Sequence, residues 1–138
     1  MRNIMPLKFQ PKAGSVVICD FHGFVTPEMV KKRPVVIIAK HKHNSQLVTV
    51  VPLSTTQPKP VAPYHHKLKE NPLPDKPKDL ATWAKCDMVV TVSLARLDRY
   101  KVARREYVVP VVSAEELAAI RHCVGIALHI DKNTPPER

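Results

Sequence analysis

Two apolar runs rich in β-branched residues, separated by a short polar turn, constrain this 138-residue chain more than any other feature. The run 35–39 (Val-Val-Ile-Ile-Ala) follows Pro34, and the run 47–51 (Leu-Val-Thr-Val-Val) follows a polar stretch that contains Asn44 and Ser45. Short continuous runs of such residues are typical of strands buried on both faces, and Asn and Ser favour tight turns. We therefore predict two antiparallel strands joined by a hairpin turn, with the first beginning after Pro34.

Strand-like segments flank this hairpin on both sides. Residues 16–21 are β-rich and bounded by Gly14 and Gly23, residues 81–92 contain one long strand or two short ones, and residues 107–109 form a last strand. Residues 22–33 form a loop. A basic stretch with Arg96, Arg99, Lys101, Arg104 and Arg105 precedes the last strand.

A helix begins after Ser113. Ser113 and Glu116 have the spacing of a capping box, in which the serine accepts from the Glu116 amide and the glutamate side chain reaches back. Apolar residues then recur on one helical face at Leu117, Ile120, Val124, Ala127 and Leu128. The pattern predicts a C-terminal helix that covers the sheet.

Six prolines lie between Gln57 and Lys78. Because proline donates no amide hydrogen bond and has a fixed φ, this density predicts an irregular surface loop at 57–80, with a short strand possible within 62–68. We expect a basic N-terminal arm at 1–13, a single domain at 14–130 and a tail at 131–138.

Composition restricts the class of protein. A hydrophobic content of 44% is typical of a folded domain, and a formal net charge of +10 favours polyanionic partners such as nucleic acid. No run approaches the roughly 20 apolar residues that span a bilayer, and the start lacks a secretory signal, so we expect a cytoplasmic protein without a membrane partner. The three cysteines have no CxxC spacing, which favours buried free thiols.

Polar side chains stand at neighbouring ends of the predicted hairpin. Arg33 precedes the first strand, and Ser54 follows Pro52 and Leu53 at the end of the second. Adjacent antiparallel strands lie about 5 Å apart, so both side chains can converge on one phosphate. A guanidinium can hold two phosphate oxygens and stabilise a pentacoordinate transition state. The alternative is that Arg33 solvates a strand end and Ser54 caps a turn.

Further candidates surround this pair. Glu28 can act as a general base or orient Arg33, Lys31 and Lys32 can attract a polyanion, and Thr55 and Thr56 can bond phosphate oxygens. Each has an ordinary alternative as a solvated loop or turn residue.

A third group lies further along the chain. Lys85 and Asp87 flank Cys86 and would share one strand face, where they can contact a phosphate and a base edge or form an ion pair. Trp83 would share that face, either stacking an unpaired base or packing in the core. With three glycines in the chain, there is no glycine-rich phosphate loop.

Taken together, these segments resemble the MazF/PemK family of toxin endoribonucleases from about Gly14 to Ile130. The resemblance rests on the segments 14–21 (Gly-Ser-Val-Val-Ile-Cys-Asp-Phe), 51–55 (Val-Pro-Leu-Ser-Thr) and 85–87 (Lys-Cys-Asp), and on Glu28 followed by Arg33-Pro34. It implies a mainly β fold with a C-terminal helix, of the SH3-like small barrel kind found in MazF, PemK and CcdB-like proteins.

The resemblance also implies function. Such a toxin is a homodimer that cuts single-stranded RNA at short sequences without a metal or other cofactor and is silenced by a cognate antitoxin protein. Arg33 matches the family's catalytic arginine, Ser54 its strand-end Ser/Thr, and Glu28 its loop acid. The implied chemistry is attack of the ribose 2′-hydroxyl on the adjacent phosphate, which leaves a cyclic phosphate and a 5′-hydroxyl.

Two positions depart from the family pattern. Pro27 stands where some members have histidine before the loop acid, and Lys85 where some have arginine. Three alternatives therefore stand beside the nuclease: a non-catalytic SH3-like module that binds nucleic acid or protein, a toxin relative that inhibits a topoisomerase, and a metal hydrolase. The last would use His41, His43, His65 and His66.

Overall fold

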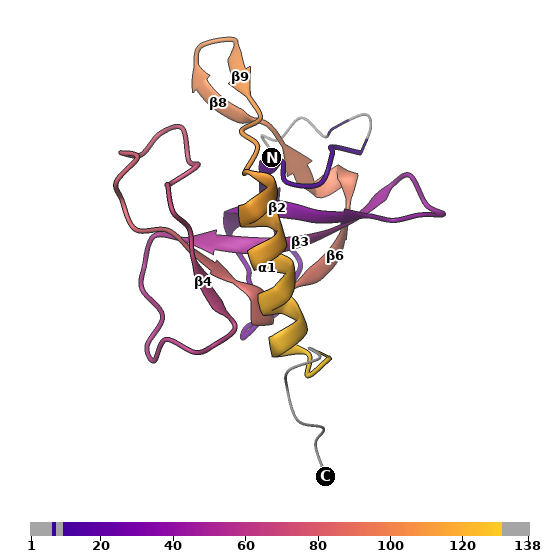
Figure 1. The fold of residues 1–138 in the computed structure, drawn as a ribbon. Helices are drawn as coiled ribbons and strands as arrows, with labels where there is room; N and C mark the ends of the chain where they lie inside the picture. The colour runs from indigo at the N-terminus through magenta and orange to yellow at the C-terminus, as the bar shows by residue number, and fades with distance from the viewer. Residues whose placement is uncertain (1–6, 8–9, 131–138) are drawn as a thin grey trace.

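The computed structural model describes Leu7 and residues 10–130. The expected tail at 131–138 and most of the expected arm lie outside these residues. The described residues form nine strands, two short 3₁₀ helices and a C-terminal helix (Figure 1). In chain order these are β1 (Val16–Asp20), β2 (Lys32–Lys40), β3 (Leu47–Ser54), β4 (His65–Lys67), β5 (Trp83–Lys85), η1 (Cys86–Met88), β6 (Val90–Ser93), η2 (Leu94–Arg96), β7 (Leu97–Asp98), β8 (Tyr100–Ala103), β9 (Glu106–Val108) and α1 (Ala114–Ala127).

The predicted hairpin is the centre of the sheet. Strands β2 and β3 pair antiparallel, as predicted, and the strand order is β4-β5-β3-β2-β1-β7, with β6 also pairing with β3. The fold is mainly β with a C-terminal helix, which confirms the predicted fold class. Among the described strands, no pairing joins the two ends of this order, so hydrogen bonds do not close the sheet into a complete barrel.

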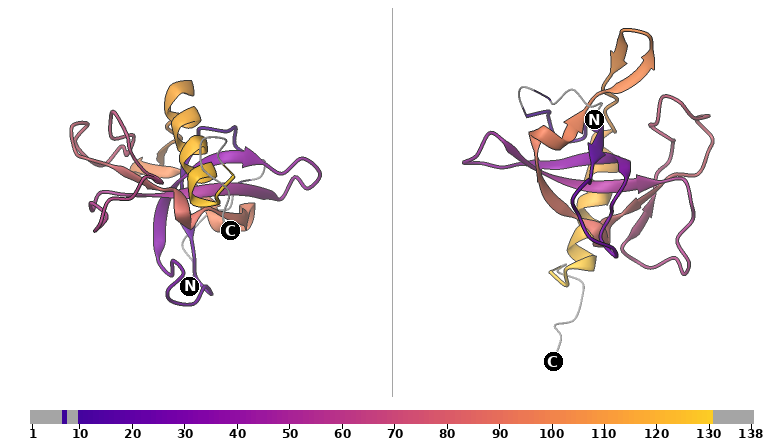
Figure 2. Two further views of the ribbon diagram at one scale, coloured as in Figure 1. Left: turned by 60° about the horizontal axis from the view of Figure 1, so that its bottom comes forward. Right: turned by 180° about the vertical axis from the view of Figure 1, so that it is seen from behind.

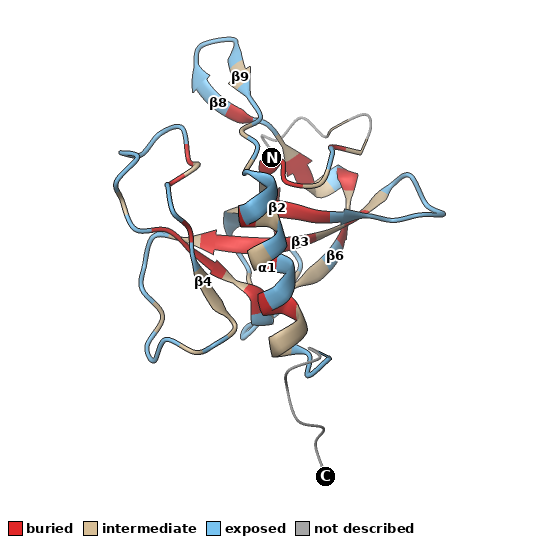
Figure 3. Cartoon of the chain, viewed as in Figure 1, coloured by how far each residue is buried: buried red, intermediate tan, exposed pale blue. Residues whose placement is uncertain are grey.

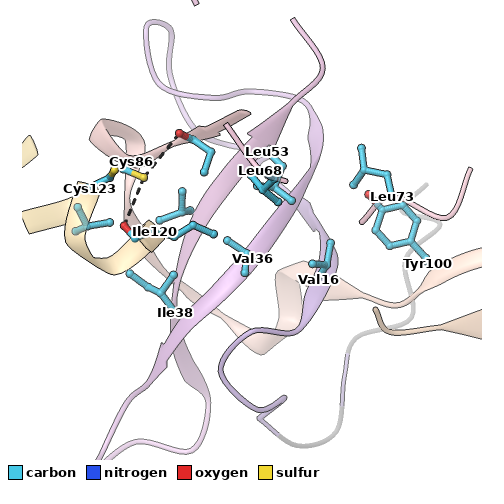
Figure 4. Close-up of a cluster of buried hydrophobic side chains, with 13 residues drawn as sticks. Val16, Val36, Ile38, Leu53, Leu68, Leu73, Cys86, Tyr100, Ile120 and Cys123 are labelled. Carbon is cyan, nitrogen blue, oxygen red and sulfur yellow. Dashed lines mark hydrogen bonds between the residues drawn. The ribbon is translucent and has the colours of Figure 1, made fainter. Parts of the chain in front are cut away.

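Alternate residues of the central strands enter two different cores. Val36 and Ile38 belong to a cluster that includes Ile120, Cys123 and Val124 of α1, whereas Val35 and Ile37 belong to a cluster on the other face. Burial on both faces explains why these strands are continuously apolar rather than alternating. Figures 1 and 2 show α1 lying across one face of the sheet, and Figure 4 shows the cluster beneath it.

Two strand predictions need correction. The first strand of the hairpin begins at Lys32 rather than after Pro34, because Pro34 pairs with Ile18 of β1 and pairing with β3 starts only at Val35. Residues 81–92 needed no correction, because they form two short strands separated by η1, which is one of the two predicted arrangements. The predicted last strand, now β9, pairs with β8 in a separate two-stranded hairpin instead of joining the main sheet.

The proline-rich segment 57–80 is irregular apart from β4, as predicted. Asn71, which is 5% exposed, fixes its second half: Nδ2 donates to the carbonyl of Pro77, while Oδ1 accepts from Leu73 N (3.0 Å) and Thr82 Oγ1 (3.0 Å). A buried amide with three satisfied hydrogen bonds gives this loop a defined path.

Part of the expected arm packs on the domain. Leu7 contacts the second core cluster, and Gln10 Nε2 donates to the carbonyl of Leu47 (2.7 Å). Within the described residues, no helix is both long and apolar enough to cross a membrane.

Candidate active site

Arg33 and Ser54 lie just beyond the last paired residues of the β2–β3 ladder. The last pair of the β2–β3 ladder is Val35 with Pro52, and extending this antiparallel register by two residues would set Arg33 opposite Ser54. Both side chains then extend the same face of the sheet, because residues two apart on a strand point to the same side. The structure brings the two residues to the same place on the surface, since both line the same two cavities.

Two adjoining cavities share these residues. One, the Lys85 pocket, has a volume of about 210 Å³, and the other, the Tyr100 pocket, has about 220 Å³. Arg33, Leu53, Ser54 and Thr56 line both. Sites that enclose a small molecule usually measure roughly 300–1,000 Å³, so these shallow recesses are better suited to a chain that lies across the surface.

The side chains at this junction are polar and accessible. Arg33 and Thr56 are exposed and Ser54 is half-buried. Ser54 Oγ accepts a hydrogen bond from Thr56 N (3.1 Å), so the serine closes a local turn, as its ordinary interpretation predicts. This contact fixes the hydroxyl on the cavity wall beside Arg33.

Lys85 is half-buried and lines the pocket named for it. It follows Ala84, which pairs with Leu53 of β3, and it shares the pocket lining with Pro52 and Arg33. Lys85 therefore adds a second positive charge to the sheet face that carries Arg33. Two cations around one cleft form a field suited to a phosphodiester.

Asp87 is not where the sequence predicted it. The two-residue strand period ends at Lys85 because Cys86–Met88 form the 3₁₀ helix η1. The carboxylate of Asp87 instead lies 3.9 Å from His65 Nε2. The prediction that Lys85 and Asp87 share a strand face was wrong.

Trp83 does share the sheet face of Lys85, but it is 8% exposed and lines neither pocket. Lys67 Nζ lies 6.0 Å from its ring centroid. Its burial therefore supports packing in the protein core rather than stacking on an unpaired base.

Glu28 and the adjacent lysines lie outside the two pockets. Glu28 Oε1 accepts from Val25 N (2.8 Å), so its carboxylate stabilises the turn that leads to Met29, a residue lining the Lys85 pocket. Lys31 and Lys32 are exposed and line neither pocket, whereas Thr55 lines the Tyr100 pocket.

Three residues of the Tyr100 pocket were missed by the sequence analysis. Asp75 and Lys76 come from the proline-rich loop, and Tyr100 begins β8. Burial, reinforced by the nearby charge of Asp75, raises the pKa of the Tyr100 phenol well above its ordinary value. The phenol is therefore a hydrogen-bond donor at any physiological pH. No local sequence signal marks these residues, because their positions depend on long-range packing.

The histidines do not form a metal centre. No cluster of three or more histidine, cysteine or acidic side chains that could hold a metal ion occurs among the described residues. His41 Nδ1 accepts from the backbone of the β2–β3 turn, while His66 Nε2 lies 2.9 Å from Glu116 Oε1.

The sequence matches a known toxin family. The family model described as PemK-like, MazF-like toxin of type II toxin–antitoxin system matches residues 12–128, which is most of the chain. The chain therefore belongs to this family.

The chain is also similar to individual proteins in sequence and in fold. The chain is 33% identical over 120 residues to a putative uncharacterized protein, YifN, of Escherichia coli strain K12, covering 72% of this chain and 80% of the relative. A MazF crystal structure from Deinococcus radiodurans matches with a TM-score of 0.60 at 20% identity, covering 86% of this chain and 96% of that one. A mycobacterial endoribonuclease in complex with its cognate antitoxin matches with a TM-score of 0.59 at 21% identity, covering 88% and 97%. At such identities, the structural matches show the shared fold.

Proposed function

We propose that this protein is a metal-independent, sequence-selective endoribonuclease that cleaves single-stranded RNA, the toxin of a type II toxin–antitoxin pair. The observation that carries the proposal is the shared cleft, in which Arg33 and Ser54 line both pockets with Lys85 on one side and Tyr100 on the other. Membership of the toxin family supports it, since one structural relative is described as an endoribonuclease.

The chemistry that suits these groups is transesterification within the RNA. The 2′-oxygen attacks the adjacent phosphorus and gives up its proton, the bond from phosphorus to the 5′-oxygen breaks, and that oxygen takes a proton. Arg33 and Lys85 stabilise the negative charge that builds on the phosphoryl oxygens. Ser54 bonds one of those oxygens, and the protonated phenol of Tyr100 donates to another or to the departing oxygen.

The proton acceptor is a carboxylate. Asp75 is the acid that lines the same pocket as Arg33 and Ser54, whereas Glu28 holds a backbone amide outside both pockets. A general base must come within hydrogen-bond reach of the proton that it removes. We therefore assign the base to Asp75 and give Glu28 a positioning role, in which it orders the loop before Arg33.

The partners follow from the same proposal. We propose that an antitoxin covers the cleft and silences the toxin. The description of one structural relative, a mycobacterial endoribonuclease in complex with its cognate antitoxin, supports a partner of this kind. We also propose that the toxin works as a homodimer in the cytoplasm, which sedimentation and cell fractionation would check.

The test compares the parent with Arg33→Ala and with a matched control, Lys40→Ala. Lys40 is an exposed cation at the other end of the same strand, β2. Each protein is incubated with mixed single-stranded RNA in excess chelator, and the product ends are analysed for cyclic phosphate and 5′-hydroxyl. We expect the parent and the control to cut, and Arg33→Ala to be slower by about two to three orders of magnitude.

Other results would contradict the proposal in different ways. Equal cutting by Arg33→Ala would indicate a contaminating nuclease, and cutting that chelator abolishes would indicate a metal enzyme. No cutting by any of the proteins would favour a non-catalytic binding module. The presence of Pro27 and Lys85, where some family members have histidine and arginine, also favours that alternative.

A further inference from the structure

The β8–β9 hairpin is a dense basic projection. From Arg99 to Arg105, four of seven residues are basic and none is acidic. Figure 1 shows this hairpin extending from the body of the protein, and Figure 3 shows it largely exposed. Among the described strands, β8 and β9 pair only with each other.

The base of the hairpin is part of the cleft. Tyr100, the first residue of β8, lines the pocket that it shares with Arg33 and Ser54. With a rise of about 3.3 Å per residue, the tip near Arg104 lies roughly 13 Å from Tyr100. The hairpin thus continues the surface of the cleft outward.

Three of its cations are exposed, and the fourth stacks on an aromatic ring. Lys101, Arg104 and Arg105 are exposed, and no carboxylate in the part of the chain that the structure describes lies within ion-pairing distance of them. The guanidinium of Arg99 lies 4.4 Å from the ring centroid of Tyr107, which orients its plane and leaves its N–H edges for a phosphate.

Arg96, the remaining cation of the basic stretch, has a different role. Its Nη1 donates to the carbonyls of Asp20 (3.0 Å) and His22 (2.7 Å), and its guanidinium lies over Phe24. It is a structural residue that holds the start of the loop between β1 and β2. The surface available to a ligand therefore begins at Arg99.

We infer that the hairpin binds the sugar–phosphate backbone of the single-stranded RNA where it leaves the Arg33–Ser54 cleft. The inference rests on the proposed function. Four cations on an exposed projection complement the closely spaced negative charges of a polyanion. Backbone contacts carry no sequence information, so the hairpin adds affinity for longer RNA without choosing the cut site.

The test uses two double variants that each remove two positive charges. Lys101→Gln/Arg104→Gln alters the hairpin, and Lys40→Gln/Lys42→Gln alters exposed lysines at the β2–β3 turn. Both lower the net charge equally, so a difference between them reports a local interaction with the RNA. The substrates are a short RNA that just spans the mapped cut site and the same RNA with long flanks on both sides.

We expect the hairpin variant to raise KM for the long RNA by about tenfold, with kcat unchanged, because two cations no longer bind phosphates. On the short RNA, both variants should match the parent in kcat and KM. Binding is measured with a long RNA that carries a 2′-deoxy group at the cut site, which prevents its cleavage. For the hairpin variant, the binding constant should depend less on salt. The slope of log binding constant against log salt concentration should be less steep by about 0.7 for each phosphate no longer neutralised. The single variant Lys101→Gln should show half the change in slope.

Each alternative outcome is decisive. Equal KM and salt slopes for the two double variants would overturn the inference, and so would a fall in kcat on the short RNA, since the hairpin would then act on the chemistry. A change of sedimenting mass in the hairpin variant, with RNA affinity equal to that of the control, would also overturn it. If the parent cuts neither RNA, the proposed function fails, and the binding comparison still decides whether the hairpin holds RNA.

Discussion

At the scale of single residues, local pattern and distant packing contribute different parts of the cleft. Arg33 and Ser54 could be identified from the sequence because each stands at the end of a β-branched run, and the antiparallel pairing of β2 and β3 brings these two ends to the same cavities. Tyr100 and Asp75 could not, because they enter the cleft from segments far along the chain.

Tyr100→Phe tests whether the phenol contributes to the reaction. A hydrogen bond to a charged group contributes about 1.5–3 kcal/mol, so we expect kcat to fall by about 10- to 150-fold. A tyrosine ordinarily ionises near pH 10, but burial raises the pKa of Tyr100 above that value. The rate of the parent should therefore not decrease near pH 10 through loss of the phenol proton. Measuring kcat of the parent and of Tyr100→Phe across a range of pH tests both the size of the decrease in kcat and its dependence on pH.

Tyr64→Phe is the matched control for this change. Tyr64 packs its ring on His65 and lines neither pocket, so its variant should keep the parent's rate. An unchanged kcat in Tyr100→Phe would remove the phenol from the mechanism.

At the scale of elements, the start of α1 differs from the expected capping box in an informative way. Ser113 Oγ accepts from Glu116 N (3.1 Å), as predicted, but the glutamate does not reach back. Its carboxylate bonds His66 Nε2 and the backbone N of Lys69, both at 2.9 Å. Glu116, at 8% exposed, therefore joins the helix to β4 and the proline-rich loop.

Glu116→Gln should destabilise the protein. The neutral amide offers one acceptor atom instead of two and lacks the charge of the carboxylate, so the buried contacts with His66 and Lys69 should weaken by about 1–3 kcal/mol in total. Urea unfolding measures the change.

The neighbouring Glu115 provides the control for this variant. Its carboxylate is exposed and lies 3.3 Å from Lys69 Nζ, and surface ion pairs contribute at most about 1 kcal/mol. Equal destabilisation by Glu115→Gln and Glu116→Gln would contradict the structural role of Glu116.

At the scale of the whole molecule, the free thiols link stability to pH. Cys19, Cys86 and Cys123 are buried and unpaired by disulfides, as expected from the sequence. Burial raises the pKa of the Cys19 thiol from 9.0 to about 12, with the charges of Arg96 lowering it and Asp20 raising it to smaller extents. Between these values, the unfolded chain releases a proton that the folded protein retains, so stability falls as pH rises.

Cys19→Ala should therefore flatten the alkaline decrease in stability. Removing the group should lessen the slope of the unfolding free energy between pH 9 and 12 by up to about 1.4 kcal/mol per pH unit. Denaturant unfolding across this range measures it. Val17→Ala, in the same core cluster, should lower stability without changing the slope. Parallel curves for the two variants would show that Cys19 does not ionise on unfolding.

The sequence by itself determined the central hairpin, the class of fold, the C-terminal helix with its serine cap, and the pair Arg33 and Ser54. These depend on periodicity and on residues that end strands, both of which are local. Tertiary structure decided that Lys85 ends its strand and separates from Asp87, that Trp83 is buried, and that Glu28 bonds a backbone amide.

Tertiary structure also brought the proline-rich loop and the base of the β8–β9 hairpin to the cleft. Such positions arise from packing between segments distant in the chain, and no local pattern encodes them. The sequence therefore predicted only part of the cleft. It identified Arg33 and Ser54 at the strand ends, but it did not identify Asp75 and Tyr100, which complete the pocket.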